Sequence, residues 1–161
     1  MKRAGILVLL AALCLLLAGC SKPASQAQPL AVYAFSGSGD GLSVTNGVIV
    51  RSDAQSVFFG GDLSIEPEDR FQGISAFTET FSVHSGEGEV TLLSNSVTDQ
   101  TGGAVHPGGQ LGKRAGEDDM LMGVSESDLQ NNLFFELQVT YPDGETQTCR
   151  VHLQLTKITA D

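Results

Sequence analysis

The chain carries two different hydrophobic patterns, and each predicts a different kind of segment. Residues 4–18 form an unbroken apolar run of 15 residues, which is shorter than the roughly 20 residues that a membrane-spanning helix needs. From residue 30 onward, apolar side chains instead recur at every second position, in short stretches that turn-forming residues separate. The first pattern indicates a targeting segment. The second is typical of β-strands and predicts an all-β domain.

The clearest predicted hairpin lies near the C-terminus and has a turn at residues 142–144. The inward positions of its two strands are Leu133, Phe135, Leu137, Val139 and Tyr141, then Cys149, Val151, Leu153 and Leu155. A continuous apolar face of this kind requires a second sheet to cover it. Just before this hairpin, Ser125 is expected to cap a brief helical turn that carries acidic residues at its start.

Shorter elements are expected earlier in the chain. Strands are predicted around residues 32–35, 42–50, 56–59, 77–84, 89–93 and 120–124, with a loop at 36–41 and one helical turn at 66–70. The strand over 56–59 is stopped by Gly60 and Gly61, and its continuation through Leu63 and Ile65 is left open. Asn46 and Gly47 favour a two-residue hairpin turn, and the alternative is one longer strand with a bulge at Gly47. Glu79 breaks the alternation of its strand, which predicts a position on the wrong face or near a sheet edge.

Many short strands with almost no helical period predict a β-sandwich of roughly 7–9 strands. The sandwich is expected to be Ig-like in architecture only, because the chain has no Trp. The predicted organisation is a helical signal peptide over residues 1–19, a cysteine and flexible tether over 20–29, and a single domain over 30–161.

The N-terminal segment closely resembles a bacterial lipoprotein signal peptide. Lys2 and Arg3 precede the apolar run, and the run ends in Leu17-Ala18-Gly19-Cys20, which matches a lipobox. The resemblance implies diacylglycerol on the Cys20 sulfur, cleavage before Cys20 and acylation of the new amino end. It therefore implies a protein held by lipid on the extracytoplasmic face of the cell membrane, because two or three acyl chains anchor a protein stably.

Removal of residues 1–19 leaves seven basic and nineteen acidic residues, a formal net charge of −12. Such a domain repels phosphate backbones, which argues against a nucleic-acid partner. Cys149 is then the one cysteine that carries no lipid, so a disulfide within the mature chain is excluded. Its strand position predicts a buried, reduced thiol.

The candidate chemical groups do not form a recognisable catalytic or metal-binding set. His84, His106 and His152 lack metal-ligand spacing. The acidic residues at 117–119 are expected to be a solvated loop. Cys149 and His152 stand three residues apart on a strand and therefore face opposite sides. The sequence predicts no catalytic residue, no metal and no cofactor.

Residues 99–119 interrupt the strand pattern and are predicted to be a long, glycine-rich loop that contacts a partner; the alternative is a tolerated insertion. Its expected contact residues are Val105, His106, Leu111, Lys113 and Arg114. Trimming the loop is expected to leave the sandwich folded.

A second resemblance covers most of the mature domain. Residues 44–50, 59–63, 93–103 and 132–137 are similar to segments of small lipoproteins from clostridia and related Gram-positive bacteria. That group implies a location and no activity. We expect a non-catalytic binding or interaction module anchored to the membrane, with a protein or envelope component as its partner. The alternatives are a small-ligand-binding lipoprotein and a small cell-envelope hydrolase.

Overall fold

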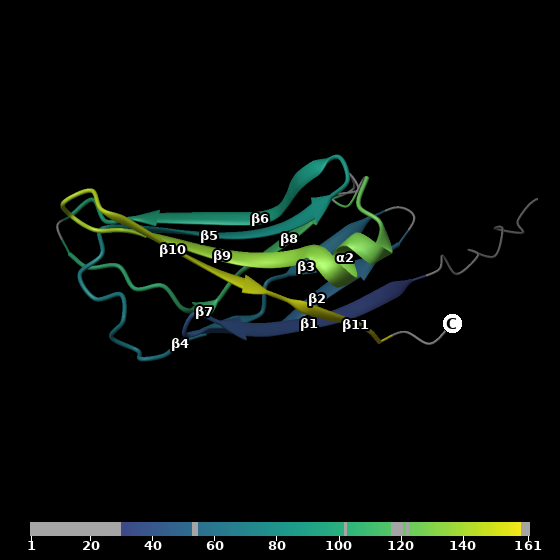
Figure 1. The fold of residues 1–161 in the computed structure, drawn as a ribbon, viewed down its shortest axis with the longest axis horizontal. Coiled ribbons are helices and arrows are strands. Elements are labelled where there is room, and N and C mark those ends of the chain that lie inside the picture. Colours follow the sequence, from purple (N-terminus) through teal and green to yellow (C-terminus); the bar gives the residue numbers. More distant parts are fainter. Residues whose placement is uncertain (1–29, 53–54, 102, 117–120, 122, 159–161) are drawn as a thin grey trace, which may run out of the picture.

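The structure of the chain is a computed structural model that describes residues 30–52, 55–101, 103–116, 121 and 123–158. Eleven strands and one helix lie within these residues (Figure 1). The elements are β1 (Ala31–Gly39), β2 (Leu42–Arg51), β3 (Ser56–Phe59), β4 (Asp62–Ile65), β5 (Ala76–Ser85), β6 (Gly88–Thr98), β7 (Gly109–Gln110), β8 (Lys113–Gly116), α2 (Glu126–Asn132), β9 (Leu133–Thr140), β10 (Thr146–His152) and β11 (Gln154–Lys157).

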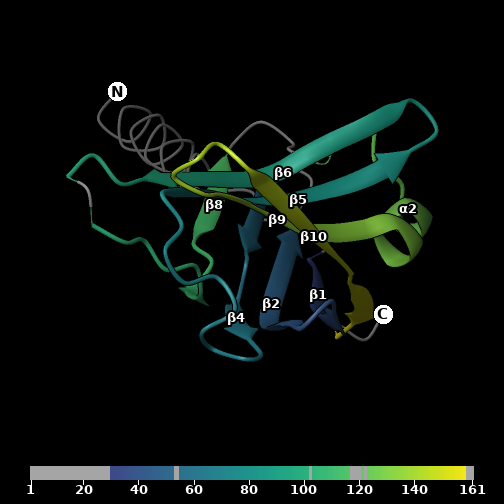
Figure 2. The same cartoon turned by 60° about the vertical axis from the view of Figure 1, so that its left-hand side comes forward.

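The strands form two antiparallel sheets, which confirms the predicted β-sandwich (Figure 2). The larger sheet has the order β11-β1-β2-β3-β8, with β4 paired to β2 and β7 paired to β4. The smaller sheet has the order β10-β9-β5-β6. The predicted return strand of the last hairpin changes sheet at Leu153, because β10 pairs with β9 and β11 pairs with β1. This crossing joins the two sheets along one side.

The core between the sheets is built on a chain of four phenylalanines. The Phe35 and Phe58 ring centroids are 5.3 Å apart, those of Phe58 and Phe81 are 4.9 Å apart, and those of Phe81 and Phe135 are 5.0 Å apart. Phe35 and Phe58 come from the larger sheet, and the other two come from the smaller one. These contacts lie within the range in which aromatic pairs stabilise a core beyond their buried area.

The first hairpin differs from the favoured prediction. The turn lies at Asp40 and Gly41, which both have positive φ angles of 51° and 69°, as a type I′ turn requires. The residues predicted as a loop therefore belong largely to β1. Asn46 and Gly47 lie inside β2, where the register against β1 shifts. The alternative prediction, one longer strand with a bulge, is the one that the structure has.

Three other local expectations can be compared with the structure. Ser125 caps α2 as expected, because its hydroxyl accepts from the Asp128 N–H and the Asp128 side chain accepts from the Ser125 N–H. The helical turn expected at 66–70 is instead a run of turns that continues to residue 73. The strand expected at 120–124 is absent from its described residues. Leu121 and Val124 are buried there and joined by a turn, so packing and not strand pairing holds them.

The expected signal peptide, the lipidated Cys20 and the tether lie outside the described residues. Among the residues that are described, no helix is both long and apolar enough to cross a membrane.

Candidate functional site

Three neighbouring strands of the larger sheet are interrupted at the same level. Asn46 and Gly47 in β2 lie opposite the connection between β3 and β4, because Val48 pairs with Phe59 and Thr45 pairs with Asp62. That connection in turn lies opposite Leu111 and Gly112, which separate β7 from β8. We call this row of interruptions the break line. A bulge bends a strand and redirects its side chains, so three aligned interruptions reshape this part of the sheet surface.

Close packing explains why glycines occupy the break line. A Cβ atom on Gly47 would lie 2.1 Å from the Phe35 ring, which fills the space that a side chain would need. Gly61 has a φ of +80°, and a Cβ atom there would lie 2.0 Å from the Thr45 carbonyl oxygen. The line is closed by two backbone hydrogen bonds of 2.9 Å, from the Gly60 N–H to the Gly112 carbonyl and from the Leu111 N–H to the Gly61 carbonyl.

The outer surface at the break line is hollowed around an exposed aromatic ring. We call this feature the Phe59 hollow; it has a volume of about 480 Å³ and is lined by Asn46, Phe59, Gly61, Asp62, Gln110, Gly112 and Lys113. Phe59 is 40% exposed. None of the described aromatic or cationic side chains stacks on its ring. A large apolar side chain that is exposed inside a polar hollow is a candidate for ligand contact.

The polar groups of the hollow come from facing positions of paired strands. Lys113 lies directly opposite Phe59, and Gln110 lies directly opposite Asp62. The Asn46 side-chain amide donates to Asp62 Oδ2 at 2.8 Å, which orients both side chains. This bond leaves the Asn46 Oδ1 and Asp62 Oδ1 atoms without a hydrogen bond to any described residue. The hollow therefore offers an apolar face beside oriented donors and acceptors.

A second hollow adjoins the first on the same outer face. We call it the Gln154 hollow; it has a volume of about 540 Å³ and is lined by Ala34, Phe35, Ser36, Thr45, Asn46, Gly47, Val48, Gln154 and Thr156. Asn46 lines both hollows. Ser36 pairs with Gln154 and Ala34 pairs with Thr156, so these side chains share one face of the sheet. Together the two hollows make an outer groove that runs across β11, β1, β2, β3 and β8.

The predicted partner loop is divided by the structure into different roles. Leu111 is 1% exposed and lies in the core, so it is not a surface contact. Val105 is half-buried and packs against the core, whereas His106 is exposed. Lys113 and Arg114 belong to β8, and only Lys113 lines the Phe59 hollow. Arg114 donates instead to the Leu92 carbonyl at 3.1 Å, which links β8 to the edge of the smaller sheet.

Glu79 is a buried carboxyl on the inner face of the smaller sheet. It lies on β5 between the buried Phe77 and Phe81, and it is 8% exposed. β5 is an interior strand, so of the two expected positions Glu79 has the inward one. Burial raises the pKa of the Glu79 carboxyl to about 7, and a hydrogen bond from the Gly108 N–H partly opposes that rise. The segment before β7 is thus fastened over the inner face by a carboxyl.

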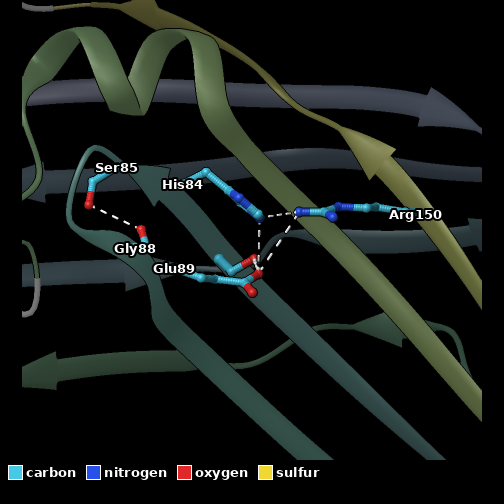
Figure 3. Close-up of polar contacts among 6 residues, drawn as sticks. His84, Ser85, Gly88, Glu89 and Arg150 are labelled. Atoms are coloured by element: carbon cyan, nitrogen blue, oxygen red, sulfur yellow. Dashed lines mark hydrogen bonds and ion pairs between the residues drawn. The ribbon is translucent and has the colours of Figure 1, made fainter.

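A local polar network joins neighbouring strands of the smaller sheet (Figure 3). The Arg150 guanidinium lies 2.5 Å from His84 Nε2 and 4.1 Å from the Phe134 ring centroid. A hydrogen bond from the Ser82 hydroxyl, with help from His84 and Arg150, holds the pKa of Glu89 below its usual value. These groups bind each other and tie β5, β6, β9 and β10 together.

The remaining sulfur and histidine candidates are structural or isolated. Cys149 is 3% exposed, as predicted, and its Sγ accepts from Arg70 Nη2 at 3.4 Å. His152 Nε2 lies 2.8 Å from the Asn131 carbonyl oxygen, at the end of α2. Within the part of the chain that the structure describes, no three His, Cys, Asp or Glu side chains gather closely enough to hold a metal ion.

Sequence reasoning missed the outer groove. The signal was the pair of glycines after Phe59 together with Asn46 and Gly47, but only strand pairing shows that they align.

No protein-family model matches this chain, and no curated protein or solved structure matches it either.

Proposed function

We propose that this protein is a lipid-anchored, extracytoplasmic binding module without catalytic activity, and that the outer groove is its binding surface. The observation that carries the proposal is the Phe59 hollow, where an exposed ring lies beside oriented polar groups. Small-molecule sites combine apolar lining with a few placed polar groups in this way. The lipobox that ends at Cys20 supports the location.

The groove supports binding better than catalysis. Asp62 and Lys113 are the two charged side chains among its lining residues. A general acid–base or nucleophilic mechanism needs a nucleophile or a proton-transfer group held against a partner that activates it. Asp62 instead accepts from the Asn46 amide, an arrangement that fits recognition.

The anchoring part of the proposal is tested by cell fractionation. Replacing Cys20 with Ala removes the sulfur that would carry the lipid, so the Cys20→Ala chain is expected to leave the membrane fraction. Cys14→Ala is the matched control, because this substitution lies inside the apolar run and spares the lipobox. Unchanged membrane retention of Cys20→Ala would contradict lipid anchoring.

The binding part is tested by crosslinking in intact cells with mass spectrometry of the neighbours. The Phe59→Ala chain is expected to lose a neighbour that the wild type crosslinks. Val97→Ala is the control, because Val97 is exposed to the same degree, at 41%, and lies outside the groove. If both variants keep every neighbour of the wild type, the outer groove is not the binding surface.

A further inference from the structure

We infer that the outer groove binds a neutral glycan chain, with the Phe59 ring stacked against one sugar and Asn46, Asp62 and Gln110 bonded to hydroxyl groups. This inference rests on the proposed binding function and adds the chemical class of the ligand.

The Phe59 hollow has the two components that a pyranose ring needs. The C–H groups on one face of a sugar ring are apolar and pack against an aromatic ring, and the Phe59 side chain is 40% exposed in this hollow. The edge of the sugar carries hydroxyl groups, each of which donates and accepts. Side-chain amides and a carboxylate match that pattern, because an amide offers both functions and a carboxylate accepts twice.

Charge in the groove favours a neutral ligand. The Phe59 hollow contains one acidic side chain, Asp62, and one basic side chain, Lys113, and the Gln154 hollow contains neither. An anionic polymer would meet a single cation there, on a mature chain whose formal net charge is −12. A cationic ligand would be repelled by the Lys113 ammonium, which lies opposite the Phe59 ring on the paired strand.

The shape of the groove favours a chain of sugars over a single one. The two hollows are about 480 and 540 Å³ in volume and meet at Asn46. Each falls within the range of small-ligand sites. The second hollow continues the polar lining with Ser36, Thr45 and Gln154, which lie on neighbouring strands of one sheet face. A linear oligosaccharide that crosses the strands would contact both hollows.

The Asn46–Asp62 bond prepares the site before a ligand arrives. Asn46 has a φ of 59°, an uncommon conformation for a residue with a side chain, and its amide reaches across to β4. Preorganised side chains lose less conformational entropy on binding. Asp62→Asn is therefore expected to weaken glycan binding while it preserves the size of the side chain.

The test is a titration of the full chain in a polyoxyethylene detergent, which contains no sugar headgroup that could compete. The probes are cellotetraose and N-acetylchitotetraose, followed by isothermal calorimetry and by chemical-shift changes of the protein. At least one tetrasaccharide is expected to bind saturably. Phe59→Ala should weaken it by about tenfold or more, Phe59→Trp should retain it, and Val97→Ala should leave it unchanged.

Three results would overturn the inference. The first is no binding of either tetrasaccharide up to concentrations on the order of 10 mM. The second is sugar binding whose affinity is the same in wild type, Phe59→Ala and Asp62→Asn. The third is seen with tetraalanine as a peptide probe: binding that depends on Phe59 while the sugars do not bind. If the sugars fail while Phe59→Ala still removes a crosslinked neighbour, the glycan inference falls and the binding surface stands. If the neighbour is also retained, both fall. Thermal unfolding of each variant confirms that a loss of binding is not a loss of folding.

Discussion

At the scale of single residues, the structure explains two polar groups that the strand pattern placed in or near the core. Glu79 is tolerated inside because it lies where the Gly108 N–H can reach it, and because burial raises the pKa of its carboxyl to about 7, so that the neutral form is present near neutral pH. Cys149 is tolerated because it behaves as a small apolar residue whose sulfur has two polar neighbours, Arg70 and Gln147. The Gly108 contact of Glu79 and the Arg70 contact of Cys149 bring in segments distant in the sequence.

Glu79 is expected to make the domain less stable as the pH rises from about 4.5 to 7. The unfolded chain releases this proton near pH 4.5 and the folded chain near pH 7, so the folded state binds more protons in between. The contribution of the protonated Glu79 carboxyl to the free energy of unfolding is complete below pH 4.5 and is lost above pH 7. It amounts to at most about 3 kcal/mol, reduced by solvent screening through the 8% of the residue that remains exposed.

Urea unfolding of wild type and Glu79→Gln from pH 5 to 8 measures this effect. The variant should show a flatter pH dependence and higher relative stability at pH 8. Glu89→Gln is the control with the opposite sign, because the pKa of Glu89 is lowered in the folded state. Its removal should cost stability at neutral pH and not at low pH. Parallel curves for wild type and Glu79→Gln would contradict the assignment.

Cys149 is expected to react slowly with a thiol reagent in the folded domain. Burial raises the pKa of its thiol, and the Arg70 guanidinium only partly opposes that rise, so little thiolate is present. Labelling is measured in a chain with Cys14 and Cys20 replaced by Ala, where one thiol remains. Fast labelling without denaturant, at the rate seen in urea, would show that the side chain is exposed.

The contact with Arg70 decides which substitution probes packing at position 149. An aspartate there would face the guanidinium that now contacts the sulfur, so it would be a partly paired buried carboxylate and not an isolated one. Cys149→Leu, which adds volume without charge, is the more direct probe of packing at this position.

At the scale of elements, the break line is where the outer surface of the larger sheet forms the Phe59 hollow. The pattern along the chain predicts that Gly60 and Gly61 stop the strand after Phe59. The structure shows that β3 and β4, on either side of these glycines, pair with the two halves of β2 on either side of its bulge. The bulge leaves no cavity at Gly47, because the Phe35 ring occupies the place of the missing side chain. This packing offsets the loss of regular strand pairing.

Gly47→Ala is therefore expected to destabilise the domain by about 1–3 kcal/mol, since the added methyl group overlaps the Phe35 ring and forces a local shift. Gly86→Ala is the matched control, because a Cβ atom at Gly86 meets nothing within 4 Å. Chemical denaturation of both variants measures the difference. Equal stability of the two would show that the ring moves aside without cost.

At the scale of the whole molecule, residues 103–116 of the segment expected to be a partner loop close one side of the sandwich. Leu111 inserts into the core, and its carbonyl accepts from the Asn95 side chain of β6 at 3.1 Å. Arg114 makes a second link between the sheets. The opposite side is joined by the crossing from β10 to β11. The expectation that trimming this segment leaves the sandwich folded therefore conflicts with its position.

Two alanine variants within this segment test that role. Leu111→Ala is expected to destabilise the domain by about 2–5 kcal/mol, the usual cost of a cavity at a buried leucine. His106→Ala changes an exposed side chain of the same segment and should stay within about 0.5 kcal/mol of wild type. A shift of the melting temperature with His106→Ala alone would place the stabilising contacts elsewhere.

The sequence alone determined the properties that depend on local pattern. Alternation of apolar side chains identified most strands and the burial of Cys149, Val151 and Leu153, because each of these depends only on the period of a strand. The Ser125 cap followed from local chemistry in the same way. The tertiary structure decided what depends on alignment between distant segments: the change of sheet at Leu153, the insertion of Leu111 and the break line under the Phe59 hollow. The sequence pattern around a glycine in a strand is the same whether that glycine lies in a turn, in a bulge or in the lining of a groove. Only the partner strand, which the chain reaches tens of residues later, distinguishes them.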